Sequence, residues 1–93
     1  MNKNYSLEDV KCYLEQNNVN KDQIYIIKTA NEDRLYVVKY RINKESIVVS
    51  IIMKNDKFCA DISEEESGTF INENIEFNYD DINKLNDILN KHN

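Results

Sequence analysis

The chain has 93 residues, of which 41% are hydrophobic and 31% charged, and its formal net charge is −5. This length predicts one domain, residues 1–93, with a single core, and the clustered apolar residues argue against wholesale disorder. The longest apolar run, residues 47–53, is far shorter than the roughly 20 residues of a membrane span, and a single glycine leaves no glycine-rich phosphate loop.

The polar start of the sequence leads directly into a helix signal. Ser6 can cap a helix with Asp9 three residues later, and Leu7, Val10 and Leu14 then share one helical face. The polar stretch at 17–20 is expected to end this helix. Because no apolar export signal precedes it, we expect a cytoplasmic protein with its two cysteines reduced.

Four strand-like runs follow at residues 23–29, 34–42, 47–54 and 57–62. Asn55 and Asp56 separate the last two runs and both tolerate positive φ, which predicts a tight hairpin. A loop with three consecutive glutamates is expected at 63–68, followed by short edge strands at 69–71 and 75–77. Turn signals between consecutive runs favour an antiparallel meander.

A last helix is predicted from the apolar residues near the end of the chain, with one face formed by Ile82, Leu85, Ile88 and Leu89. The order of elements is therefore α-β-β-β-β-(β)-α. It predicts an α+β fold, in which an antiparallel four- to five-stranded meander sheet carries the N-terminal and C-terminal helices on one face.

Strand alternation assigns the residues of the sheet to two faces. The set expected under the helices is almost uniformly apolar: Tyr25, Ile27, Tyr36, Val38, Tyr40, Ile42, Ile47, Val49, Ile51, Met53, Phe58, Ala60 and Ile62. The opposite set mixes apolar and basic residues and is expected to be solvated or to form an interface. The candidates for a homodimer contact or second interface on it are Val37, Lys39, Arg41 and Ile52.

Residues for catalysis and for metal binding are scarce. The one histidine, His92, is the penultimate residue, and Cys12 and Cys59 are far apart in sequence. These three residues assemble neither a nucleophile–base pair nor a zinc site. We therefore expect no catalytic residue, no metal site, no cofactor and no enzymatic activity.

Negative charge is concentrated in the C-terminal third. Residues 1–57 contain ten basic and eight acidic residues, whereas residues 58–93 contain two basic and nine acidic ones. A charge distribution this uneven bears on partners and association rates more than on fold. The candidate partner-binding residues are Asp61, Glu64, Glu65, Glu66, Glu73 and Glu76.

Direct nucleic-acid binding is disfavoured by the same acids. The order of elements is similar to that of the double-stranded-RNA-binding domain, which docks phosphates through lysines at the start of its last helix. Here the corresponding stretch, residues 78–83, contains Asp80 and Asp81, which would repel phosphate.

The resulting hypothesis is a non-enzymatic inhibitor that binds a protein. Its acidic third would block a basic, nucleic-acid-handling partner, as a phage anti-defence protein, an anti-CRISPR or an immunity protein does. The alternative is a homodimeric structural module in which the acids serve only solubility. Neither hypothesis involves a membrane or direct contact with nucleic acid.

Overall fold

The computed structural model describes residues 5–41, 44–66 and 69–91, with the side chains at 40, 41, 44, 45, 65, 66, 69–71 and 91 outside this description. In chain order the elements are α1 (Leu7–Gln16), the 3₁₀ turn η1 (Lys21–Gln23), β1 (Ile24–Lys28), β2 (Asp33–Arg41), β3 (Lys44–Lys54), β4 (Lys57–Glu66), β5 (Thr69–Phe77), the 3₁₀ turn η2 (Tyr79–Asp81) and α2 (Asn83–Lys91).

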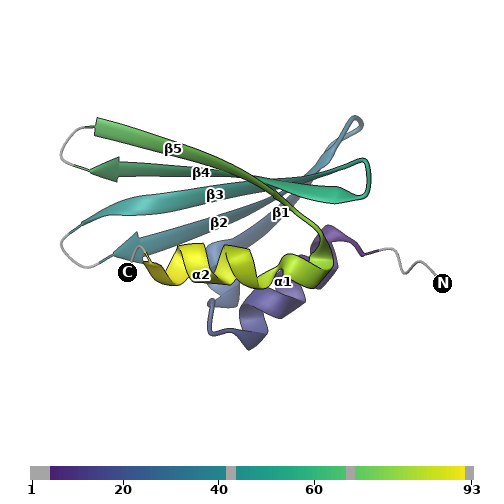
Figure 1. Cartoon of the computed structure of the whole chain (residues 1–93), viewed down its shortest axis with the longest axis horizontal. Helices are drawn as coiled ribbons and strands as arrows, with labels where there is room; N and C mark the ends of the chain where they lie inside the picture. The colour runs from purple at the N-terminus through teal and green to yellow at the C-terminus, as the bar shows by residue number, and fades with distance from the viewer. Residues whose placement is uncertain (1–4, 42–43, 67–68, 92–93) are drawn as a thin grey trace.

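The five strands form one antiparallel meander in the order β1-β2-β3-β4-β5, and both helices lie on the same face of it (Figure 1). The predicted α+β architecture is confirmed. The long strands make the molecule elongated, with extents of 46 × 27 × 21 Å.

Helix α1 begins and ends at the predicted residues. The backbone N–H of Ser6 donates to the carboxylate of Asp9 at 2.7 Å, which is half of the expected capping box. At the other end Asn18 adopts φ 71°, and the N–H of Val19 donates to the carbonyl of Leu14 at 2.9 Å. Asparagine tolerates this left-handed conformation, so the helix ends without a glycine.

The hairpin between β3 and β4 also has the predicted turn. Asn55 and Asp56 adopt φ values of 52° and 65°, and Lys54 pairs with Lys57 across them. Two consecutive positive φ angles match the right-handed twist of the flanking strands, which fixes the register of the hairpin.

The core lies between the helices and one face of the sheet. The predicted face of α1 is buried, and so are three of the four residues predicted for α2, with Ile88 partly buried against them. The ring of Tyr5 stacks on that of Tyr79 with centroids 3.7 Å apart, which joins the start of α1 to the turn before α2. Burial of each large apolar side chain contributes about 1.5–3 kcal/mol.

The structure corrects the predicted loop at 63–68 over residues 63–66, and it joins the two short strands predicted after it; residues 67 and 68 lie outside the described residues. β4 continues to Glu66, and β5 is one continuous strand of nine residues. Glu64, Glu65 and Glu66 pair with Ile71, Phe70 and Thr69. The backbone at these three positions is therefore extended and paired with β5, and does not form a solvated loop.

The predicted faces of β1 and β2 are reversed in the structure. Leu35 and Val37 are fully buried beneath the helices, opposite Ile51 and Val49 of β3. Tyr25 and Ile27, expected in the core, are 51% and 50% exposed on the other face. Both faces of these strands carry apolar residues, so alternation alone could not show which face is buried. The register of β2 with β3 determines it.

This reversal is tested by truncating one residue from each face. Leu35→Ala should lower the free energy of unfolding by about 2–5 kcal/mol, because it leaves a cavity in the core. Ile27→Ala should change it by about 0.5 kcal/mol, since half of that side chain is already in water. Urea unfolding followed by circular dichroism measures both, and a larger effect for Ile27→Ala would contradict the observed faces.

Candidate functional site

The largest surface left uncovered by the helices is the second face of the sheet, here called the open face. Its residues alternate with the buried ones and come from all five strands: Tyr25, Ile27, Arg34, Tyr36, Val38, Val48, Ser50, Ile52, Cys59, Asp61, Ser63, Asn72, Asn74 and Glu76. Lys54 and Lys57 lie at the hairpin turn at one end of it. The face has no described helix above it (Figure 1).

The chemistry of the open face changes from one edge to the other. One row of directly paired residues crosses all five strands, and it consists of Tyr25, Tyr36, Ser50, Asp61 and Asn74. Apolar and aromatic side chains therefore belong to β1 and β2, and acid and amide side chains to β4 and β5. The surface offers an apolar half for contact and a polar, negative half for charge recognition.

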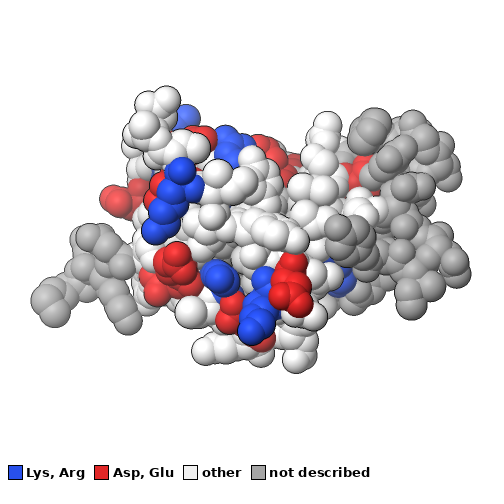
Figure 2. All heavy atoms as spheres, turned by 180° about the vertical axis from the view of Figure 1, so that it is seen from behind, with Lys and Arg blue, Asp and Glu red and all other residues white. Residues whose placement is uncertain are grey.

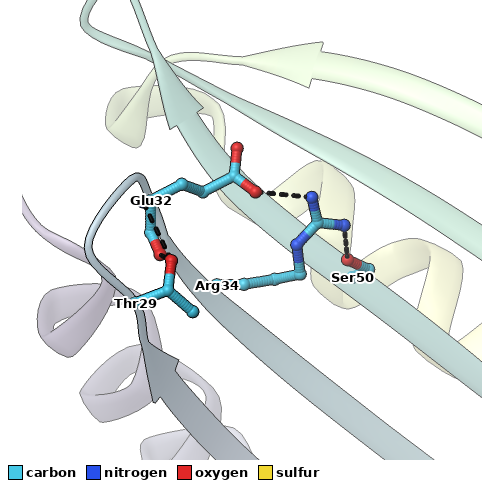
Figure 3. Close-up of polar contacts among 4 residues, drawn as sticks. All are labelled: Thr29, Glu32, Arg34 and Ser50. Carbon is cyan, nitrogen blue, oxygen red and sulfur yellow. Dashed lines mark hydrogen bonds and ion pairs between the residues drawn. The ribbon is translucent and has the colours of Figure 1, made fainter.

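Arg34 lies where these two halves meet and is held in place by two side chains (Figure 3). Its guanidinium donates to the carboxylate of Glu32 at 2.7 Å and to the hydroxyl of Ser50 at 3.0 Å. The hydrogen bond that Arg34 donates to Glu32 is the largest cause that raises the pKa of Arg34, with a smaller contribution from the charge of Asp61. Arg34 thus stays charged, with its planar group fixed against the sheet.

The turn between β1 and β2 positions Glu32 for this contact. The hydroxyl of Thr29 accepts from the N–H of Glu32 at 3.1 Å and donates to its carbonyl (Figure 3). The ion pair itself is weak in energy, because the side chains of Arg34 and Glu32 are 35% and 44% exposed. Solvent screens exposed pairs, so the network orients Arg34 more than it stabilises the fold.

Amide side chains order the negative half of the open face. The side-chain amide of Asn74 donates to the carboxylate of Asp61, and the hydroxyl of Ser63 lies 3.1 Å from the amide oxygen of Asn72. Glu76 is exposed on the same face, opposite Cys59 and diagonal to Asp61. Such diagonal neighbours are about 7–8 Å apart, within reach of one ligand surface.

Four of the six acids predicted to bind a partner have described side chains, and these four lie in three environments. Asp61 and Glu76 lie exposed on the open face. Glu73 pairs with Ile62 and so has the helix-side parity, but it is exposed because β5 is the outermost strand. Glu64 is only 5% exposed, and the side chains of Glu65 and Glu66 lie outside the described residues.

Of the four residues predicted for a dimer or second interface, the structure places one on the open face. Ile52 lies there, half-buried. Val37 is fully buried in the core, and Lys39 lies on the helix side, where its ammonium donates to the carbonyl of Leu89 at 2.8 Å. The assignment of Val37 and Lys39 to the open face was wrong, because the register of β2 with β3 turns both toward the helices. The side chain of Arg41 is outside the described residues.

The hydrogen bond from Lys39 to the carbonyl of Leu89 links the last turn of α2 to β2. A lysine beside the carbonyl end of a helix satisfies a free acceptor and complements the helix dipole. The adjoining cavity, about 380 Å³, is lined mainly by amides, among them Asn17, Asn86 and Asn90. It is a polar hollow at the ends of both helices.

Metal-binding clusters and membrane-spanning helices are not found in the described part of the chain. No group of three or more histidine, cysteine, aspartate or glutamate side chains is arranged there to hold a metal ion, and no helix there is long and apolar enough to cross a membrane. Cys12 and Cys59 are both free thiols, and His92 lies outside the described residues. Seen from behind, described acidic and basic side chains lie interleaved on the surface (Figure 2).

The chain matches no family model, no curated protein and no solved structure. The residues that sequence reasoning missed are the exposed apolar ones of β1 and β2 and the fixed Arg34. One signal for them was present: tyrosine keeps its hydroxyl near water, so tyrosines at alternate strand positions are better suited to an open face than Leu35 and Val37.

The role of Lys39 is tested by removing its charge. Lys39→Met should lower the free energy of unfolding by about 1–3 kcal/mol, because a half-buried hydrogen bond to a charged donor is lost and the carbonyl of Leu89 loses that donor. Lys57→Met, at an exposed lysine of the hairpin, is the matched control and should change it by about 0.5 kcal/mol or less. Equal effects in urea unfolding would show that the contact with α2 contributes nothing.

Proposed function

We propose that this chain is a non-enzymatic protein-binding inhibitor, which blocks a basic, nucleic-acid-handling partner with the acids of its C-terminal third. One observation carries the proposal: Asp61 and Glu76 are exposed on a sheet face that no described helix covers. The amides of Asn72 and Asn74 lie on the same face, and Glu73 is exposed at the same edge. Phage anti-defence proteins, anti-CRISPRs and immunity proteins are the kinds of inhibitor that it would resemble.

The physical basis is competition for cationic sites. A groove that binds nucleic acid is lined by lysine and arginine side chains, which carboxylates on a rigid surface can occupy in place of phosphates. A sheet fixes the backbone positions from which its side chains project, so no backbone ordering is needed when these side chains are bound. The hydrogen bond from Asn74 to Asp61 supports the proposal, because it orients one of the carboxylates in advance.

The apolar half of the open face offers the packed contact area that the charged half does not provide. Charge complementarity raises the association rate and selects partners, while affinity depends largely on a well-packed apolar contact. Ile52 of β3 is a diagonal neighbour of Asp61, and Tyr36 and Val38 lie one strand further away on β2. All three are half-buried, without a described layer above them. A partner that covers both halves would associate faster because of the negative half and bind more tightly because of the apolar half.

The experiment compares two double charge reversals with the same net charge. In Asp61→Lys with Glu76→Lys the changes lie on the open face, and in Glu15→Lys with Asp87→Lys they lie at exposed positions of the two helices. Proteins captured from a bacterial lysate at low and high salt are identified, and their nucleic-acid binding is measured in competition. The open-face variant should inhibit at least about tenfold less than the wild type, and the helix variant should match the wild type.

The salt dependence supplies the second criterion. Contacts between exposed charges weaken as the Debye length shortens, so the captured protein should be released at high salt. The proposal is wrong if the open-face variant captures and inhibits the same protein as the wild type does. It is also wrong if both double variants lose inhibition equally, since net charge and not the open face would then be responsible. Circular dichroism confirms that each variant is folded.

A further inference from the structure

The two edges of the sheet differ in charge. β1 is one edge, and its first four residues, Ile24 to Ile27, are uncharged, with Lys28 at its end. β5 is the other edge, and it carries exposed Glu73 and Glu76. An edge strand presents unpaired backbone N–H and C=O groups to any strand that approaches, and charged side chains are the usual protection against such pairing.

Self-pairing of β5 would meet electrostatic repulsion. In an antiparallel pair of two copies, centred on the middle of the nine-residue strand, Glu73 would face Glu73 of the second copy. Like charges directly opposite one another destabilise a strand pair. In this register the β5 edge is therefore protected against a second copy of this chain.

β1 has no such protection, and its exposed side chains suit a second copy. Tyr25 and Ile27, both on β1, are the two most exposed large hydrophobic residues in the described part of the chain, at 51% and 50%. Among the described elements, α1 makes its main contacts with β2 and β3. β1 pairs with β2 alone in the described sheet, so its outer side has no strand partner there.

We propose that the chain forms a homodimer by antiparallel pairing of β1 with β1 of a second copy, with the two-fold axis at Ile26. In this register Tyr25 faces Ile27 of the second copy and Ile27 faces its Tyr25, and Ile24 faces Lys28. The two five-stranded sheets join into one continuous sheet, and their open faces become one surface. Aromatic and β-branched residues are favourable partners across a strand pair, and no like charges meet.

The dimer leaves the acids of each copy accessible. Asp61 and Glu76 belong to β4 and β5, so they lie toward the two far ends of the joined sheet. The inference therefore stands independently of the proposed inhibitory function. Because a five-residue strand supplies less contact than a standard interface of about 1,600 Å², the dimer should dissociate on dilution.

Sedimentation equilibrium over a concentration series tests the proposal through paired charge substitutions. Tyr25→Lys with Ile27→Lys places lysine opposite lysine in both cross-strand pairs and should weaken self-association by at least about tenfold, or about 1.4 kcal/mol. Tyr25→Glu with Ile27→Glu should weaken it equally. A mixture of the two variants should restore the dimer, because lysine then faces glutamate, and restoration also shows that both variants fold.

A second variant separates edge pairing from stacking of the open faces. Ile52→Lys places a charge in the middle of the open face, away from either edge, and should leave the dimer intact. Hydrogen exchange should show protection of β1 amides that increases with protein concentration. A chain that stays monomeric throughout the series overturns the proposal. So does loss of the dimer in Ile52→Lys but not in the β1 variants, which would place the interface on the open face.

Discussion

The register of β2 against β3 is the constraint on which the rest of this structure depends. Leu35 pairs with Ile51, and Val37 pairs with Val49. This register places four buried aliphatic residues together on the helix-covered face of the adjacent strands β2 and β3. A shift of one residue would exchange every side chain of β2 between core and solvent. The positions of Tyr36 and Arg34 on the open face, and of Lys39 beneath α2, all follow from this one pairing.

Two short helices on one side leave the meander with an uncovered face. That face is ordered by local contacts: Arg34 is fixed by Glu32 and Ser50, and Asp61 by Asn74. These contacts are partly exposed and add little to stability, but they hold polar groups in defined positions on a rigid sheet. An oriented and partly apolar surface of this kind is suited to recognition of another protein.

The acidic residues of the C-terminal third lie in different environments: buried, on the open face, or at the β5 edge. The continuation of β4 through Glu66 turns an apparent acidic loop into strand, which buries Glu64 and leaves Asp61 and Glu76 on the open face. Glu73 lies at the β5 edge, where it opposes pairing with a second copy. The β1 edge carries no acid, and this asymmetry connects the charge distribution of the sequence to the way in which copies of the chain could assemble.

The sequence by itself determined the elements with strong local signals. The capping pair Ser6 and Asp9, the Asn55–Asp56 turn and the helical faces of α1 and α2 depend on residues close together in the chain, and all agree with the structure. Local pattern did not determine the faces of β1 and β2, because apolar residues occupy both parities there. Only pairing with β3 decided that Val37 is core and Tyr25 surface. The extent of the fifth strand and the strand conformation of Glu64, Glu65 and Glu66 were likewise decided by pairing between strands, because the β4–β5 hydrogen bonds outweigh the local preference of three acids for a loop.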